Sequence, residues 1–301
     1  MGNFVMLGVC FALGVVLRRF RLIPENAAQT VNAVIIYVSL PAVALSYVHD
    51  LPMTADLLGL AGMGWIVFFA GWGFFALLGR VLGWSRATVA CLTLTAALGN
   101  TSFVGLPMIE VFYGPEWVGP GLLADQGGTF MALCLVGIPL AAASAGNRPS
   151  LLDTLRRMVT FPPFLAMLVA LALKPLAYPA WADAMLLRIG GTLTPLALLS
   201  VGLTVRFAAL RGRARPLAAG VAYKMLLAPL LILGLYVGLL GLTGTMVKVT
   251  VFEAAMPPMV TGGIISMQYG LEPELAGVLL GVGIPLIFAT AWGWYGLLQL
   301  V

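Results

Sequence analysis

The sequence has few charged residues, one histidine and three cysteines, and each scarcity excludes a class of protein. Of the 301 residues, 9% are charged and 61% are apolar, whereas a soluble globular domain usually has about 25% charged residues. The folded surface is therefore too poor in charge to face water, and we expect the whole chain to lie in a lipid bilayer. One histidine is too few for a zinc site or an acid–histidine catalytic group. The three cysteines fall in separate apolar segments and form no metal-spaced pair, so we expect no enzyme active site, no metal and no cofactor.

Apolar segments separated by turn residues predict ten membrane-spanning helices. They lie near residues 2–17, 29–48, 57–82, 87–112, 120–145, 160–178, 184–207, 215–241, 245–269 and 274–299. Most of them reach the ~20 residues that a bilayer requires. The longest polar connection, residues 146–160, is a short linker, so no connection is long enough to hold a soluble domain.

Twelve of the sixteen basic residues fall in alternate connections between these helices. They are Arg18, Arg19, Arg21, Arg80, Arg86, Arg148, Arg156, Arg157, Arg206, Arg211, Arg213 and Arg215. Basic loops stay in the cytoplasm, so we expect both termini on the opposite, outer side. The net charge of +5 then reflects membrane topology and not nucleic-acid binding. The connection YGLEPEL should also be cytoplasmic, yet it has no basic residue. The lone histidine, His49, lies in an outer connection beside Asp50, where we expect it to be solvated, with pH sensing as the alternative.

The two halves of the chain share a pattern of landmarks. Pro24 and Pro179 are 155 residues apart, Pro41 and Pro195 are 154 apart, and Gly114 and Gly270 are 156 apart. Each half then holds five spans, and an odd number makes the second half enter the membrane from the opposite side. Inverted repeats are typical of transporters, with the site at mid-membrane where the repeats meet. We therefore predict a first repeat over residues 1–146, a cytoplasmic linker over 147–160 and a second repeat over 161–301.

Two spans at matching positions contain residues that interrupt a helix. LGNTSFVGLP covers residues 98–107, within the stretch 96–114 that aligns at an offset of 156 with FEAAMPPMVTGGIISMQYG, residues 252–270. Proline removes a backbone donor and glycine lowers the cost of non-helical geometry. Such breaks survive in a membrane only where protein or a wet cavity covers them. Two half-helix N-termini, each with a partial positive charge, would then face one cavity and attract an anion.

The candidate substrate-binding residues follow from these breaks. They are Asn100, Thr101, Ser102, Gly105, Pro107, Pro257, Pro258, Thr261 and Gly262, with Pro41 and Pro195 in the apolar walls. The alternative is that the glycines only permit close packing and the prolines only kink their helices. Interruptions at matched positions in both halves favour a binding site.

Four segments, NAVIIYVSLPAVAL, GNTSFVGLP, KMLLAPLL and AAMPPMVTGGIISMQYG, resemble the auxin efflux carrier family, and the similarity covers essentially the whole chain. The family includes plant auxin exporters and bacterial permeases for malate- or malonate-like acids. The resemblance implies an all-α membrane protein with ten helices in two inverted five-helix repeats and with crossed helices 4 and 9. It also implies elevator-like motion of transport helices 3–5 and 8–10 against scaffold helices 1, 2, 6 and 7. Many relatives have asparagine where this chain has Thr261, which leaves the substrate undetermined.

Asp125, Lys224 and Glu253 are the main ionisable candidates inside predicted spans, where a charge costs about 2.5–3.5 kcal/mol or more. Asp125 would carry a proton or organise the crossing, unless it lies at the membrane interface. Lys224 would pair with Asp125 or Glu253, or neutralise an anion, unless it snorkels to the surface. Glu253 would take part in coupling, although a carboxylate beside an anion site is unfavourable, and Glu110 is a weaker candidate of the same kind.

The sequence therefore predicts a secondary carrier for a small organic anion in the plasma (inner) membrane of a bacterium. One alternative is a sodium-coupled carrier with the related bile-acid-transporter architecture, in which unwound carbonyl groups hold Na⁺. Another is a non-transporting membrane receptor or a membrane-embedded enzyme. The expected partners are the organic anion and the lipid bilayer, not nucleic acid. The oligomeric state stays open, with a homodimer among the alternatives.

Overall fold

A computed structural model describes residues 2–52, 54, 56–147, 150–204 and 213–301, and this part of the chain is helical almost throughout, without a named β-strand. The α-helices of the first half are α1 (Gly2–Arg19), α2 (Ala27–Val34), α3 (Leu40–Val43), α4 (Asp56–Leu82), α5 (Arg86–Ala96), α6 (Leu106–Phe112), α7 (Val118–Leu123) and α8 (Ile138–Ser144). Those of the second half are α9 (Leu151–Val159), α10 (Pro162–Leu173), α11 (Ala180–Gly190), α12 (Leu193–Thr204), α13 (Ala214–Ala222), α14 (Ala228–Leu233), α15 (Thr245–Ala254), α16 (Val260–Gln268) and α17 (Pro273–Leu298).

Several of these helices join through wider π-helical turns. These turns are η1 (Ile35–Ser39), η2 (Ala44–Val48), η3 (Thr101–Gly105), η5 (Ala124–Phe130), η6 (Leu133–Gly137), η7 (Tyr223–Leu227) and η8 (Gly234–Leu239), and η4 (Pro115–Trp117) is a short 3₁₀ turn. Such turns are rare and concentrate at functional sites. Three of them, η3, η5 and η7, hold residues that the sequence singled out as charged or polar candidates.

Six continuous helical segments of the described chain are long and apolar enough to cross a membrane. They are Ala27–Val48, Leu57–Leu82, Pro115–Ser144, Ala180–Thr204, Ala214–Leu239 and Pro273–Leu298, and Thr101–Phe112 and Pro162–Leu173 are shorter apolar helices. Each range that the sequence predicts to be helical contains helix in the structure. A lipid bilayer suits this much uncharged helical surface, so the chain is an integral membrane protein.

Two features of the chain differ from the sequence prediction. The expected linker at 147–160 contains a helix, α9, whose Leu151, Leu155 and Met158 recur at helical spacing. The span predicted at 184–207 corresponds to the continuous segment Ala180–Thr204, in which a turn at Gly191 and Thr192 joins α11 to α12. The polar residues between 147 and 160 favoured a linker over the helix α9, and the apolar pattern around Gly191 gave no indication of the turn between α11 and α12.

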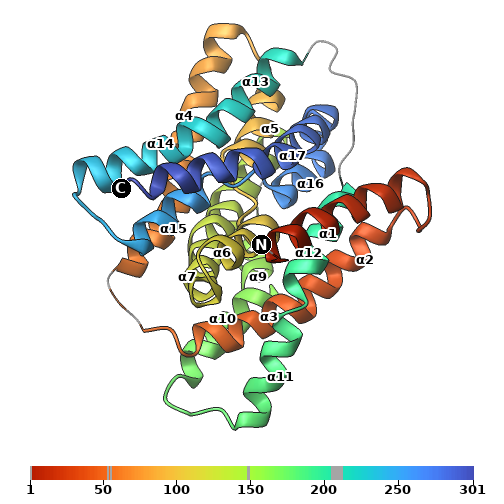
Figure 1. Ribbon diagram of the computed structural model, residues 1–301. Coiled ribbons are helices and arrows are strands. Elements are labelled where there is room, and N and C mark those ends of the chain that lie inside the picture. The colour runs from red at the N-terminus through yellow and green to blue at the C-terminus, as the bar shows by residue number, and fades with distance from the viewer. Residues whose placement is uncertain (1, 53, 55, 148–149, 205–212) are drawn as a thin grey trace.

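The helices pack in two groups, and each half of the chain contributes to both (Figure 1). The first helix group contains α1–α3 and α10–α12, in which α1 lies along α12 and α3 packs against α10 and α11. The second helix group contains α4–α8 and α13–α17, in which α4 packs against α5, η5 and α15, and α16 packs against α5 and α17. The groups meet mainly where α12 packs against η3 and α6, and where η2 packs against α7.

Small residues bring α1 and α12 into close contact. A Cβ atom on Gly14 would lie 2.2 Å from the carbonyl oxygen of Leu199, and a Cβ atom on Gly202 would lie 2.2 Å from that of Phe11. Membrane helices lack a hydrophobic drive to associate and depend on such close backbone approach. This contact therefore holds the first helix group together.

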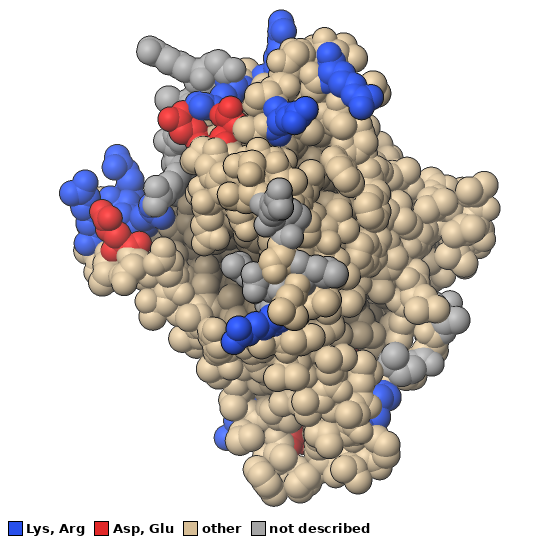
Figure 2. Space-filling view, turned by 180° about the vertical axis from the view of Figure 1, so that it is seen from behind, with Lys and Arg blue, Asp and Glu red and all other residues tan. Residues whose placement is uncertain are grey.

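The charged side chains on one face of the molecule lie mostly at its margins, and the middle of that face is largely uncharged (Figure 2). Arg213, the residue directly before α13, pairs with Glu272 at 3.3 Å and also with Glu274. The connection YGLEPEL is thus paired with Arg213. Arg148, Arg206 and Arg211 lie outside the described residues.

The prediction that His49 is solvated is wrong, because its side chain is only 8% exposed. Its Nδ1 lies 2.6 Å from a carboxyl oxygen of Asp50, and its Nε2 lies 2.9 Å and 3.2 Å from the carbonyl oxygens of Leu176 and Leu173. Lys174 donates a hydrogen bond to the carbonyl oxygen of His49 itself. Burial alone lowers the pKa of His49, but the hydrogen bonds to Asp50 and to the two carbonyl groups outweigh it and raise the pKa above its ordinary value. The imidazole therefore joins the end of η2 to the end of α10.

Candidate functional site at the helix crossing

Both interrupted spans leave helical geometry, and their non-helical segments cross. α5 ends at Ala96 and η3 begins at Thr101, while α15 ends at Ala254 and α16 begins at Val260. Gly99 and Pro258 lie opposite each other in an antiparallel bridge. The N–H of Asn100 donates to the carbonyl oxygen of Pro257, and the N–H of Met259 donates to that of Thr95, both at 2.8 Å.

This pairing explains how polar backbone survives in the interior of an apolar protein. Pro257 and Pro258 have no N–H group, so they remove two donors that a continuous helix would use. The backbone groups that the two breaks release satisfy each other across the crossing. The prolines and glycines of the two motifs therefore determine where the chain is non-helical.

Asn100 has a buried donor without a partner. Its side-chain oxygen accepts a hydrogen bond from the N–H of Phe103 at 3.3 Å and so caps the start of η3. Its side-chain nitrogen has no hydrogen-bond partner among the described residues, although the residue is only 3% exposed. A buried unsatisfied donor is costly. The amide nitrogen is therefore a buried donor that no acceptor among the described residues satisfies.

Asp125 is saturated with hydrogen-bond donors. Its two carboxyl oxygens accept from the hydroxyl groups of Thr101 and Ser102, each at 2.5 Å, and from the side-chain amide of Gln126 at 2.6 Å. The residue is 1% exposed, so its carboxyl group is buried inside the protein. Donors around both oxygens stabilise the ionised carboxylate. Asp125 therefore ties η3 to η5.

Lys224 does not snorkel to the surface, because it is only 1% exposed. Its ammonium donates to the carbonyl oxygen of Ala254 at 2.8 Å. That carbonyl ends α15, where the helix dipole places partial negative charge. A Cβ atom on Gly99 would lie 2.9 Å from the Lys224 nitrogen, so the ammonium contacts both broken spans. The expected ion pair with Asp125 or Glu253 is not among the ion pairs of the described residues.

A narrow internal space lies beside these groups. It is lined by Met63, Gly64, Val67, Ala97, Leu98, Gly99, Thr101, Thr129, Lys224 and Glu253, and it is too narrow to admit a water molecule. The crossing is therefore closed in this conformation. η3 contributes Thr101 to this space and α16 contributes no residue to it, so this space lies beside only one of the two half-helix N-termini.

The remaining predicted residues lie at different distances from the crossing. Ser102 is half-buried, and Gly105 and Pro107 are buried in η3 and α6. Thr261, by contrast, is exposed. Gly262 is buried, and α16 approaches α5 so closely there that a Cβ atom would lie 1.9 Å from the carbonyl oxygen of Leu94.

The two prolines of the predicted walls are both half-buried but lie in different surroundings. Pro195 belongs to α12, which packs against η3. Pro41 belongs to α3, which packs against α10 and α11.

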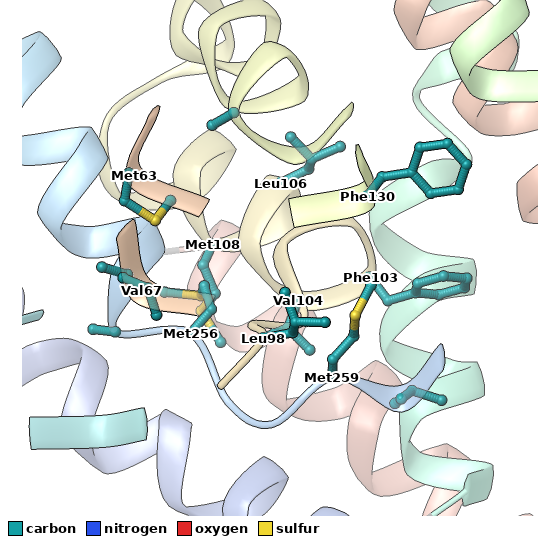
Figure 3. Close-up of a cluster of buried hydrophobic side chains, with 14 of the residues drawn as sticks. Met63, Val67, Leu98, Phe103, Val104, Leu106, Met108, Phe130, Met256 and Met259 are labelled. Carbon is teal, nitrogen blue, oxygen red and sulfur yellow. The ribbon is translucent and has the colours of Figure 1, made fainter. Parts of the chain in front are cut away.

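Apolar side chains enclose the crossing (Figure 3). They include Met63, Val67, Leu98, Phe103, Val104, Leu106, Met108, Phe130, Met256 and Met259, all of them buried. Methionine side chains adapt to irregular shapes. The four methionines therefore form an adaptable part of the wall around the crossing.

The sequence argument missed the contribution of η5 beyond Asp125. Thr129 lines the internal space, and a Cβ atom on Gly128 would lie 2.5 Å from the carbonyl oxygen of Ala61 in α4. On the other side, a Cβ atom on Gly64 would lie 2.5 Å from the backbone nitrogen of Thr129. The run GGT within an apolar span was the available signal.

Comparisons with known proteins decide the family. The family model described as "Membrane transport protein" matches residues 1–145 and 147–295. The chain belongs to this family, the auxin efflux carriers. It is 27% identical over 290 residues to an "Uncharacterized transporter" of Methanothermobacter thermautotrophicus, covering 94% of each chain. It is also 22% identical over 287 residues to an "Uncharacterized transporter" of Methanocaldococcus jannaschii, covering 91% of this chain and 92% of the relative. This auxin efflux carrier family member is therefore an integral membrane transport protein.

Proposed function

We propose that this protein is a secondary carrier that moves a small organic anion, such as a carboxylate, by alternating access. The observation that carries the proposal is the buried amide nitrogen of Asn100, which has no hydrogen-bond partner among the described residues and lies where two broken helices cross. A carboxylate oxygen would accept its hydrogen bond, and the N-terminus of η3 would add partial positive charge. The apolar residues of Figure 3 would contact the rest of the solute.

Opening of the crossing requires relative motion, because the internal space does not admit even water in the present conformation. We propose an elevator-like motion of the second helix group against the first. The proposal is supported by the packing, since each group is held by contacts of its own and the groups meet at η3, α6, α7, α12 and η2. The residues around Asn100 would then reach opposite sides of the membrane in turn.

A transport assay tests the proposed function. The full-length protein is reconstituted in liposomes, and uptake of radiolabelled acetate, malonate and malate is measured. Asn100→Asp keeps the oxygen that caps η3 but removes the amide donor and adds a like charge. A hydrogen bond to a charged group is worth about 1.5–3 kcal/mol, so uptake should fall about 10- to 100-fold.

Ser85→Ala is the matched control, because Ser85 caps α5 by accepting from the N–H of Thr88 at 3.0 Å. It removes a helix cap of the same kind far from the crossing, and uptake should stay near the wild-type rate. If none of the three acids is taken up, the carboxylate assignment fails. If Asn100→Asp transports normally, the assignment of Asn100 fails.

We further propose that both termini lie outside the cytoplasm, which is supported by the alternation of basic connections along the chain. Asp50 and Glu274 belong to opposite sides in this orientation, and their side chains are 73% and 69% exposed. In a cysteine-free background, a membrane-impermeant maleimide should label Asp50→Cys in intact cells and Glu274→Cys only after permeabilisation. The reverse pattern would invert the proposed orientation.

A further inference from the structure

Glu253 is a fully buried residue beside the crossing, and its carboxyl group has no hydrogen-bond partner among the described residues. A Cβ atom on Gly105 would lie 2.4 Å from Oε2, and one on Gly121 would lie 3.5 Å from Oε1. The two glycines in η3 and α7 therefore make room for this carboxyl group.

The surroundings of Glu253 are dry in this conformation. The space that the carboxyl group lines is too narrow for a water molecule. An ionised carboxylate with neither water nor a donor is strongly disfavoured in a protein interior. The closed conformation therefore favours the neutral carboxylic acid.

Two charged side chains face Glu253 from neighbouring elements, Lys224 from η7 and Asp125 from η5. Lys224 directs its ammonium to the carbonyl oxygen of Ala254 and forms no ion pair with Glu253. The carboxyl oxygens of Asp125 already accept from three donors, and any negative charge on Asp125 opposes a second one nearby. Neither neighbour replaces a proton on Glu253.

We propose that Glu253 is the proton-binding group of this carrier. Its carboxyl group holds one proton while the crossing is closed, and it releases that proton to water when the crossing opens. On opening, the O–H bond of the carboxyl group breaks and the proton passes to water. Lys224 lines the same space as Glu253, so its ammonium stabilises the carboxylate that remains. Closing reverses the step, with one proton taken from water. The coupling of this cycle to transport rests on the proposed carrier function, but the protonation of Glu253 does not.

Infrared spectroscopy of the purified full-length protein tests the protonation without a substrate. At neutral pH, wild type should show the C=O stretch of a buried carboxylic acid. The band should be lost in Glu253→Gln and retained in Asp125→Asn. Its absence from wild type, or its loss in Asp125→Asn and not in Glu253→Gln, would overturn the proposal. Should Glu253→Gln not fold, Glu253→Asp keeps a carboxyl group at this position and should show the band at a shifted frequency, and an unshifted band would overturn the proposal.

Transport under a pH gradient tests the coupling. Malonate uptake into liposomes is measured with and without an inward proton gradient while the membrane potential is clamped. The gradient should stimulate uptake by wild type, and this stimulation should be lost in Glu253→Gln. Glu116→Gln is the control, because Glu116 is an exposed glutamate in η4, after the other broken span, and has no role in the proposed cycle. It should keep the stimulation.

The remaining outcomes separate this inference from the proposed function. Stimulation that persists in Glu253→Gln, or uptake that depends on Na⁺ in place of protons, would contradict the coupling role. Failure of wild type to take up any carboxylate would instead count against the proposed carrier function, and the infrared band would still decide whether Glu253 is protonated.

Discussion

Replacing Gly262 by alanine is expected to push the two broken spans apart. α16 lies against α5 at this residue, and a Cβ atom would lie 1.9 Å from the carbonyl oxygen of Leu94 and 2.8 Å from its carbonyl carbon. Ordinary van der Waals contact begins at 3.4 Å. Both colliding atoms belong to the backbone, so no rotamer change relieves the clash, and α16 has to shift by roughly 1.5 Å in a close-packed interior.

The free-energy change combines three terms. Overpacking of a close-packed interior costs about 1–3 kcal/mol. The shift also stretches the nearby hydrogen bond from Met259 to Thr95, now 2.8 Å long, whose loss adds about 1 kcal/mol. Alanine gains up to about 1 kcal/mol over glycine in helix propensity. The last two terms offset each other, and we expect a net destabilisation of about 1–3 kcal/mol from the clash.

Gly263→Ala is the matched control, because it lies one residue farther along the same helix. Its Cβ atom would meet Cδ1 of Leu280 at 2.9 Å, the far end of a flexible side chain. Both variants gain the same helix propensity, so only the rigidity of the neighbour differs. Thermal unfolding in detergent should place Gly262→Ala several degrees below wild type and Gly263→Ala close to wild type. Equal melting temperatures for the two variants would refute the reasoning.

Two further predictions concern buried polar groups. Asp125→Leu leaves the hydroxyl groups of Thr101 and Ser102 without their acceptor, and partial relief by rotation toward backbone carbonyl groups should limit the loss of stability to about 2–5 kcal/mol; a melting temperature equal to that of wild type would contradict it. His49→Gln tests the raised pKa of the imidazole. A raised pKa contributes stability below the unfolded value that is lost as pH rises through the folded value. The free energy of unfolding of the variant should therefore be lower than that of wild type at mildly acidic pH, by at most about 1 kcal/mol, and equal to it at alkaline pH. A loss of stability that is largest at alkaline pH would contradict this prediction.

The interruptions at the crossing could be predicted because single residues determine them. Pro257 and Pro258 have no backbone donor, and Asn100 follows a glycine, so the sequence alone indicates where helical geometry ends. The helical ranges followed from apolar composition for a similar reason, since a backbone in lipid has few alternatives to a helix. The division of the chain into two inverted repeats stays a prediction.

The side-chain partners at the crossing could not be predicted, because they depend on which helices become neighbours. Asp125 finds its donors in Thr101 and Ser102, which lie more than twenty residues earlier in the chain. Lys224 was expected to seek a carboxylate but instead donates to the carbonyl oxygen of Ala254. Apolar periodicity carries no information about such pairings, since it indicates only which side of a helix is buried.

The same neighbours determine which movement would admit water to the crossing. Glu253 is enclosed by Gly105 of η3 and Gly121 of α7, and all three belong to the second helix group. If that group moves as a unit, its own contacts stay closed, and water has to arrive where α12 of the first group covers η3. The hydroxyl of Thr194, beside Pro195 in α12, donates to Glu110 across this boundary. That hydrogen bond has to break before α12 separates from η3, so separation of the groups, hydration of Asn100 and release of the proton from Glu253 would occur in one movement.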